Sequence, residues 1–172
     1  GLDDLSTGDV TIRGEWSGIN YKDALAATGK GQILKTYPLV GGIDVAGEVV
    51  SSASKRFAPG DEVLVTGCSL SEKRDGGYSQ YLRLDSRHVV PLPKGLTTRE
   101  AMGIGTAGFT AAISLYRMEA LGQTPTAGPI VVTGSTGGVG SFAIDILTRA
   151  GYEVHAITGK VDQFDYLEEL GA

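Results

Sequence analysis

The sequence predicts a mixed α/β protein built from two unlike domains, residues 1–96 and residues 97–172. Two observations lead to this prediction. The first domain contains several short runs of strand type, separated by turns that carry glycine or proline. The second domain alternates helix-type and strand-type segments around a glycine-rich loop. We therefore expect a barrel-like β domain followed by an α/β domain.

The first domain contains five runs with the length and composition of strands. They are expected at residues 9–16, 44–52, 61–67, 78–84 and 88–92. Turn signals such as "APGDE", "RDGGY" and "PLPKG" separate them. Residues 20–29, "NYKDALAATG", interrupt this pattern and predict a short helix that Gly29 ends. Many short strands with such turns are typical of a β-barrel.

The second domain begins with helical signals. Thr97 and Glu100 have the spacing of a capping box at a helix start, and residues 107–121 carry apolar side chains at helical spacing. The continuous apolar run "PIVVTG" (129–134) then predicts a parallel strand buried on both faces.

The end of the chain repeats the alternation of helix and strand. A helix after the glycine-rich loop is stopped by Gly151, a strand is expected at 152–159, and a last helix at 163–172. This order is half of a doubly wound α/β domain, which normally has about six strands. We therefore expect the chain to be a fragment of a longer protein.

Composition restricts the function. The formal net charge is −5, which disfavours nucleic acid or an anionic membrane as the partner because both attract a basic face. The one cysteine, Cys68, excludes an internal disulfide framework and fits a reducing compartment. No apolar stretch is long enough to span a bilayer, and the first residues do not resemble a signal peptide. We expect a soluble, cytoplasmic protein that acts on a small molecule.

The segment "VVTGSTGGVG" (131–140) predicts a phosphate site. Glycines between a strand and a helix allow a tight turn and a close approach of the backbone to a pyrophosphate, which the helix N-terminus then attracts. The alternative is a tight turn without a ligand. The residues expected to bind the dinucleotide here are Ser135, Gly137, Gly138, Val139, Gly140 and Ser141.

The residues after the second strand favour NADPH over NADH. NAD sites usually carry Asp or Glu there, to bind the ribose 2′-hydroxyl. This chain has Thr158, Gly159 and Lys160 instead, and no carboxylate before Asp162. A lysine and a hydroxyl suit a 2′-phosphate. The alternative for Lys160 is a solvated loop cation.

Five segments together resemble one family. They are "INYKDALAATGKG", "GGIDVAGEVV", "PGDEVLVTG", "GTAGFTA" and "VVTGSTGGVG". In this order they resemble the zinc-independent medium-chain dehydrogenase/reductases of the YhdH quinone oxidoreductase type, which include acryloyl-CoA reductases. The resemblance extends from about Gly8 to Ala172. It implies a GroES-like β-barrel domain, then the first half of a Rossmann domain, with the nicotinamide between the domains and a full-length homodimer.

The resemblance also implies that no metal is bound. At the positions where zinc members of the superfamily have a histidine and a cysteine ligand, this chain has Ile43 and Thr106. Cys68 is the only thiol, and we expect His88 and His155, both in strand-like runs, to be structural. Without a metal, the fitting chemistry is hydride addition to an activated C=C bond or a quinone.

The resemblance places Asn20, Tyr21 and Asp44 beside the nicotinamide as candidate catalytic residues. Tyr21, Thr106 and Thr110 are also candidates for cofactor contact, although a buried threonine often bonds its own helix. On its residues alone, "NYKD" is a polar helix start in which Asp23 is a surface charge. Two other functions stay open: an NADPH-binding protein without useful turnover, and an inactive fragment of the reductase. Because half of the nucleotide domain is missing from this chain, we expect the isolated fragment to be inactive.

One loop departs from the family pattern. At residues 68–77, "CSLSEKRDGG", Cys68 stands where the acryloyl-CoA reductases would have a tryptophan. We expect the charged part of this loop to be an exposed, solvated turn. The departure leaves the substrate open among an acyl-CoA, an enone and a quinone.

Overall fold

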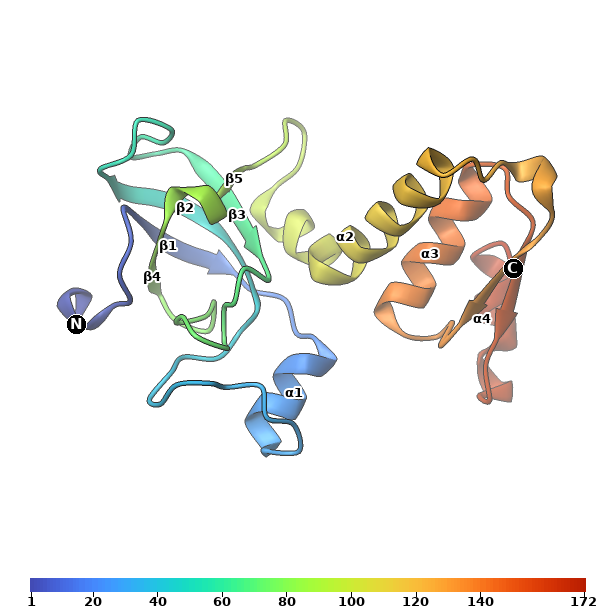
Figure 1. The fold of residues 1–172 in the computed structure, drawn as a ribbon, viewed down its shortest axis with the longest axis horizontal. Helices are drawn as coiled ribbons and strands as arrows, with labels where there is room; N and C mark the ends of the chain where they lie inside the picture. Colours follow the sequence, from blue (N-terminus) through green and yellow to red (C-terminus); the bar gives the residue numbers. More distant parts are fainter. The chain divides into compact units, whose positions relative to one another are not determined.

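The computed structural model describes residues 1–172, which form two compact units, Gly1–Thr106 and Ala107–Ala172. The division lies C-terminal to the domain boundary that we expected between residues 96 and 97. The structure is mixed α/β, as expected: the first unit is built on an antiparallel sheet and the second on a parallel pair of strands (Figure 1). None of the helices combines the length and the apolar character needed to cross a lipid bilayer.

The sheet of the first unit has five strands in the order β4-β1-β2-β3-β5. They are β1 (Val10–Trp16), β2 (Asp44–Ser52), β3 (Glu62–Thr66), β4 (Tyr81–Leu84) and β5 (Val90–Pro91). Each lies within a run expected to be a strand. The placement of His88 in a strand was wrong, because it ends a short 3-10 helix, Ser86–His88, in which the Asp85 side chain accepts a hydrogen bond from the Arg87 N–H.

One face of the sheet forms the core of the first unit. Alternate residues of β1 and β3, among them Val10, Ile12, Val63 and Val65, are fully buried. They form one apolar cluster with Leu82 and Leu84 of β4. Period-two alternation of this kind follows from the geometry of a strand with one covered face.

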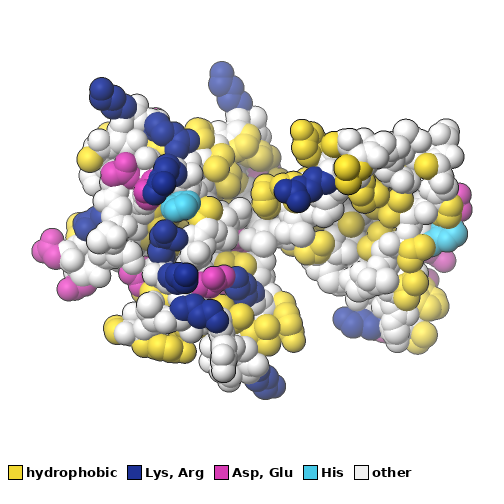
Figure 2. Space-filling model, in the orientation of Figure 1, with side chains coloured by type: hydrophobic (Ala, Val, Ile, Leu, Met, Phe, Trp, Pro, Cys, Tyr) yellow, Lys and Arg dark blue, Asp and Glu magenta, His cyan; other side chains and the backbone are white.

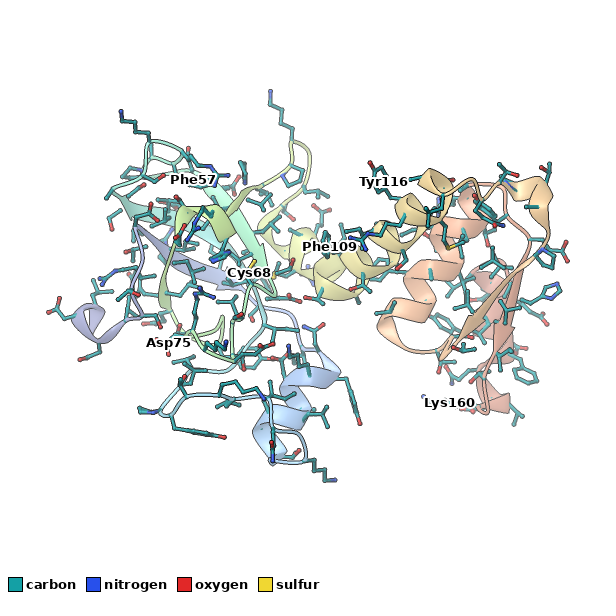
Figure 3. The ribbon with its side chains drawn as sticks, viewed as in Figure 1. Phe57, Cys68, Asp75, Phe109, Tyr116 and Lys160 are labelled. Carbon is teal, nitrogen blue, oxygen red and sulfur yellow. The ribbon has the colours of Figure 1, made fainter.

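The loop at residues 68–77 is packed rather than solvated, so the expectation of an exposed turn was wrong. Leu70 and Ser71 are fully buried. The Asp75 carboxylate accepts hydrogen bonds from the Ser6 hydroxyl at 2.6 Å and from the Val40 N–H at 3.1 Å. Cys68, labelled in Figure 3, is free and packs against the core. Although the sequence of this loop is rich in charged residues, the loop has apolar side chains in the core and hydrogen bonds to other segments.

Two helices start and end as their capping residues predict. Helix α1 (Tyr21–Thr28) ends at Gly29, whose φ of 67° is left-handed. Helix α2 (Thr98–Ala120) starts with the expected capping box, in which the Thr97 N–H and hydroxyl both donate to Glu100. The two helices expected there are confirmed: within α2 they meet at a kink at Gly105, where the backbone is not helical, with φ of 49° and ψ of −155°.

The second unit contains a parallel pair of strands, β6 (Ile130–Thr133) and β7 (Val154–Ile157). Helix α3 (Gly138–Arg149) follows the glycine loop, and α4 (Phe164–Glu169) follows β7. Ile144 and Leu147 of α3 pack with Tyr152, Val154 and Leu167 in the core of this unit. This is the β-loop-α-β-α order that the sequence predicts.

The expectation that the strand at 129–134 is buried on both faces was wrong. Burial alternates along β6: Ile130 and Val132 pack into the core of the unit, whereas Val131 and Thr133 are exposed. Ile157 of β7, on the same exposed side, is 55% accessible. The apolar run thus has one covered face in this chain.

The charged side chains are unevenly divided. Figure 2 shows most of the Lys and Arg side chains on the first unit, interspersed with Asp and Glu, and hydrophobic side chains at the surface of both units. On the face shown in Figure 2, acidic side chains therefore lie among the basic ones of the first unit.

Candidate active site and nucleotide-binding loop

Asp44 is the centre of a polar cluster in the first unit. It is the first residue of β2 and is 1% exposed. Its Oδ2 accepts hydrogen bonds from the Asn20 side-chain amide at 2.9 Å and from the Thr106 N–H at 3.0 Å. Its Oδ1 accepts a hydrogen bond from the Thr106 hydroxyl. Three neutral donors thus hold this buried carboxylate, as a buried polar group requires.

Two glycines make room for the Asp44 carboxylate. A Cβ added to Gly18 would lie 3.0 Å from Asp44 Oδ2, and one added to Gly105 would lie 2.9 Å from the same atom. Gly105 also has the left-handed φ that interrupts α2. Thr106 directly follows this interruption, and its N–H reaches Asp44.

Asp23 is a site residue that the sequence reasoning missed. We took it as a surface charge, but it is 5% exposed. Its Oδ2 accepts from the Asn20 N–H at 2.9 Å and its Oδ1 accepts from the Ile43 N–H at 3.1 Å. The signal was available, because Asp23 is three residues after the helix cap Asn20, the spacing of a capping box.

Tyr78 was also missed. Its hydroxyl donates to the Gly18 carbonyl at 3.2 Å. Partial burial, and next the negative charge of Asp23, raise the pKa of Tyr78 to about 12. The Tyr78 hydroxyl is therefore neutral at physiological pH and acts as a hydrogen-bond donor.

Tyr21 and Lys22 are the first two residues of α1. The Tyr21 side chain is 80% exposed, so its hydroxyl is accessible to a ligand. Lys22 forms an ion pair with Glu72 of the 68–77 loop. The ion pair joins the helix that carries Tyr21 to the loop that departs from the family pattern.

The glycine loop of the second unit has the geometry expected for a phosphate site. Gly134 has a left-handed φ of 61°, and Gly137 caps α3. A Cβ added to Gly140 would lie 2.5 Å from the Gly134 carbonyl oxygen. Only glycine at 140 lets the first turn of α3 approach the loop this closely. The N–H groups of that turn have no partner within the helix and carry its partial positive charge.

The loop divides into buried and accessible parts. The Ser135 hydroxyl is buried and lies 2.8 Å from both the Val132 and the Ile157 carbonyl oxygens. It therefore joins the ends of β6 and β7. Gly137, Gly138 and Val139 are exposed, and the Ser141 hydroxyl donates to the Ser135 carbonyl at 3.3 Å.

The residues after β7 lie at the same end of the strand pair as the glycine loop. Thr133 and Ile157, the last residues of the two strands, are register partners. Thr158, Gly159 and Lys160 follow Ile157, and the Lys160 N–H donates to the Thr158 hydroxyl at 3.1 Å. The Lys160 side chain is exposed and lies on the segment that follows β7 (Figure 3). One dinucleotide could therefore place its pyrophosphate at the glycine loop and its ribose beside Lys160.

Thr106 and Thr110, two further candidates for contact with the cofactor, lie in different units. Thr106 belongs to the first unit, and Thr110 to the second, where its carbonyl accepts the Ser114 hydroxyl at 2.7 Å.

The structure contains no group of three His, Cys, Asp or Glu side chains that could hold a metal ion. Ile43 is a buried residue beside Asp44, and His155 contacts Glu153 at 2.8 Å.

The first unit matches a known family of protein domains. Residues 6–94 match the model of the alcohol dehydrogenase GroES-like domain. The chain belongs to this family. The GroES-like domain that the resemblance implied is thereby confirmed for the first half of the sequence.

YhfP of Bacillus subtilis (strain 168), which is named as a quinone oxidoreductase, is similar to this chain. The two sequences are 51% identical over 170 residues, which cover 99% of this chain and 52% of YhfP. The acrylyl-CoA reductase AcuI of Ruegeria pomeroyi is 49% identical over 171 residues, again 99% of this chain and 52% of the relative. The chain thus spans about half the length of the curated relatives it matches.

Solved structures of relatives have the same fold and contain nicotinamide nucleotides. The yhdH oxidoreductase of Salmonella enterica, solved with NADP, is 46% identical with a TM-score of 0.97 over 100% of this chain and 53% of that chain. The Bacillus subtilis yhfP structure, solved with NAD, is 49% identical with a TM-score of 0.94 over 100% of this chain and 52% of that chain. Both nucleotides therefore occur in structures of similar proteins.

Proposed function

We propose that the protein is an NADPH-dependent reductase that adds hydride to an activated C=C bond or a quinone without zinc. The observation that carries the proposal is the strand–loop–helix of β6 and α3, in which Gly140 has no room for a Cβ. A relative with the same fold contains NADP. Relatives named for quinones and for acrylyl-CoA support this pair of substrate classes.

The chain's residues fit a dinucleotide. The free N–H groups at the start of α3 would hold the pyrophosphate at Gly137, Gly138 and Val139. Thr158, Gly159 and Lys160 would hold the 2′-phosphate, because a lysine neutralises it and a carboxylate would repel it. When bound, the nucleotide supplies the hydride.

Asn20 and Asp44 would position the substrate. Asp44 binds one N–H of the Asn20 amide, which fixes the orientation of the amide group. The other N–H of Asn20 would then donate to the substrate oxygen, where negative charge develops as hydride adds to a conjugated carbon. The N–H and the hydroxyl of Thr106 also hold Asp44.

Tyr21 would supply a hydrogen bond or a proton to the same oxygen or to the adjacent carbon. Its 80% exposure leaves the hydroxyl free to reach a ligand. The ion pair between Lys22 and Glu72 would keep the first turn of α1 in place. Two other properties belong to this proposal: a homodimer, which the resemblance implies, and a cytoplasmic location, which the composition of the sequence favours.

Zinc independence rests on the donor set. The two aligned ligand positions carry Ile43 and Thr106, and neither isoleucine nor a threonine that already bonds Asp44 is a zinc ligand of the usual N or S type. The single thiol, Cys68, is partly buried and packs against the core of the first unit. Activity that is unchanged by a chelator would agree with this part of the proposal.

The test is the oxidation of NADPH by the full-length protein, followed at 340 nm, with acrylyl-CoA, an enone and a quinone as acceptors. We expect turnover with at least one acceptor and a fall of about 10²-fold in kcat for Tyr21→Phe, because one acid–base group contributes about that much. Tyr37→Phe is the matched control, since Tyr37 is equally exposed at 79%. NADPH binding without turnover on any acceptor would favour a binding protein instead.

A further inference from the structure

A cavity of about 220 Å³ lies within the first unit, beside the Asp44 cluster. Ala26 and Ala27 of α1 and Leu34 and Leu39 of the following segment make most of its wall apolar. The Tyr78 ring forms another side. Gly41 and Gly42 leave room for this ring, because an added Cβ would lie 3.2 Å and 2.8 Å, respectively, from its carbon atoms.

Ser71 is the unpaired polar group of the cavity. The residue is fully buried, and its Oγ has no hydrogen-bond partner in the protein. It lies 4.0 Å from the position of an added Cβ on Gly41. The backbone fixes Ser71 in place: its φ is 60° and its N–H donates to the Arg74 carbonyl at 2.9 Å. A buried hydroxyl is almost always paired, so this one is suited to a partner from outside the chain.

The second polar group on the wall restricts the charge of a ligand. Each oxygen of the Asp23 carboxylate accepts one backbone N–H, which holds the carboxylate in place, and its negative charge lies on the wall of the cavity. An anion would be repelled here. A neutral ligand with one oxygen would pair with Ser71 and leave the Asp23 hydrogen bonds intact.

The volume restricts the size of the ligand. An apolar cavity of about 150 Å³ in another protein holds one benzene molecule. A cavity of about 220 Å³ therefore accommodates a slightly larger molecule, of about seven non-hydrogen atoms.

We propose that this cavity is a binding site for a small, neutral, mainly apolar carbonyl compound or alcohol whose oxygen hydrogen-bonds to the Ser71 hydroxyl. The inference goes beyond the proposed reductase function and does not depend on it. Binding here uses only residues of the first unit and requires no nucleotide.

The experiment compares two probes of equal size, cyclohexanone and methylenecyclohexane, which differ in the oxygen. Each is titrated into the full chain without nucleotide, and the amide chemical shifts of Gly41, Gly42 and Ser71 are followed. We expect saturable shifts with both probes. In Ser71→Ala the affinity for cyclohexanone relative to methylenecyclohexane should fall about fivefold, the effect of one neutral hydrogen bond.

Ala26→Leu is the second variant, because it fills the cavity from α1 without introducing a polar group. It should abolish saturable binding of both probes at this site. Ser71→Ala removes a hydroxyl that has no protein partner, so this variant should have the unfolding temperature of the parent chain. The result for Ser71→Ala therefore decides the proposal even if Ala26→Leu does not fold. An unchanged affinity ratio in Ser71→Ala, or shifts that never saturate, would overturn the proposal.

Discussion

The side-chain amide of Asn20 donates a 2.9 Å hydrogen bond to Oδ2 of Asp44, which joins the residue before α1 to the first residue of β2. The same oxygen accepts the Thr106 N–H. One buried carboxylate thus fixes the position of a helix start, a strand start and the interruption of α2. The stability of the first unit and the geometry of its candidate site therefore depend on the same atoms.

Replacing Asp44 separates the effect of shape from that of hydrogen bonding. Asp44→Ala should lower the free energy of unfolding by about 2–4 kcal/mol, because two buried N–H donors lose their acceptor. Asp44→Asn should cost less than about 1 kcal/mol, since its carbonyl can accept both N–H groups and its amide can donate to the Thr106 hydroxyl. Urea denaturation measures both values. Equal losses for the two variants would contradict the role given to the hydrogen bonds.

The close approach at Gly140 predicts a sharp difference between two glycines. Gly140→Ala would place a Cβ 2.5 Å from the Gly134 carbonyl oxygen. We expect a loss of about 1–3 kcal/mol in unfolding free energy from this overpacking, together with weaker NADPH binding. Gly103→Ala is the control, because a Cβ there meets no atom within 4 Å. It should stabilise the helix by about 0.5–1 kcal/mol.

Tyr78 makes stability depend on alkaline pH. Its pKa is raised from 10.0 to about 12 in the folded chain, so the folded state keeps the proton that the unfolded state loses. The contribution is fully present below pH 10 and is lost as the pH rises toward 12. Unfolding measured from pH 9 to 12 should show a smaller decline for Tyr78→Phe than for the parent chain. Parallel curves would mean that Tyr78 titrates normally.

Ser135 should matter for stability more than for the nucleotide. Its hydroxyl bonds carbonyl oxygens of both β6 and β7. Ser135→Ala is therefore expected to cost about 1 kcal/mol in unfolding free energy and to leave the NADPH affinity within about twofold, because the backbone of the loop is retained. A large fall in affinity at unchanged stability would instead assign the hydroxyl to the phosphate.

Local signals in the sequence predicted most of the fold. Gly29 ends α1 and the pair Thr97–Glu100 starts α2, as expected from the chemistry of helix ends. The bounds of β2 agree with the run at 44–52. These features depend on neighbouring residues, so a single sequence suffices to find them.

Features that depend on distant residues could not be predicted in this way. The charged run around Glu72 suggested a solvated turn, yet Lys22 and Ser6 supply partners for its carboxylates from far along the chain. The exposure of Val131 depends on which elements cover the sheet rather than on the apolar run itself. The hydrogen bond from the Asn20 N–H to Asp23 was predictable from the capping position of Asp23, but its burial was not, because Glu100 occupies the same position in its own capping box and is exposed.

The measurement that tests the account most directly is a fluorescence titration of the protein with NADPH and with NADH. The parent chain and Lys160→Ala are compared, with Lys55→Ala as a matched exposed-lysine control in the first unit. The account predicts tighter binding of NADPH, and loss of that preference only in Lys160→Ala. Equal binding of both nucleotides by the parent chain would contradict the role of Lys160 as the 2′-phosphate ligand, and binding of neither would contradict the phosphate site at the glycine loop.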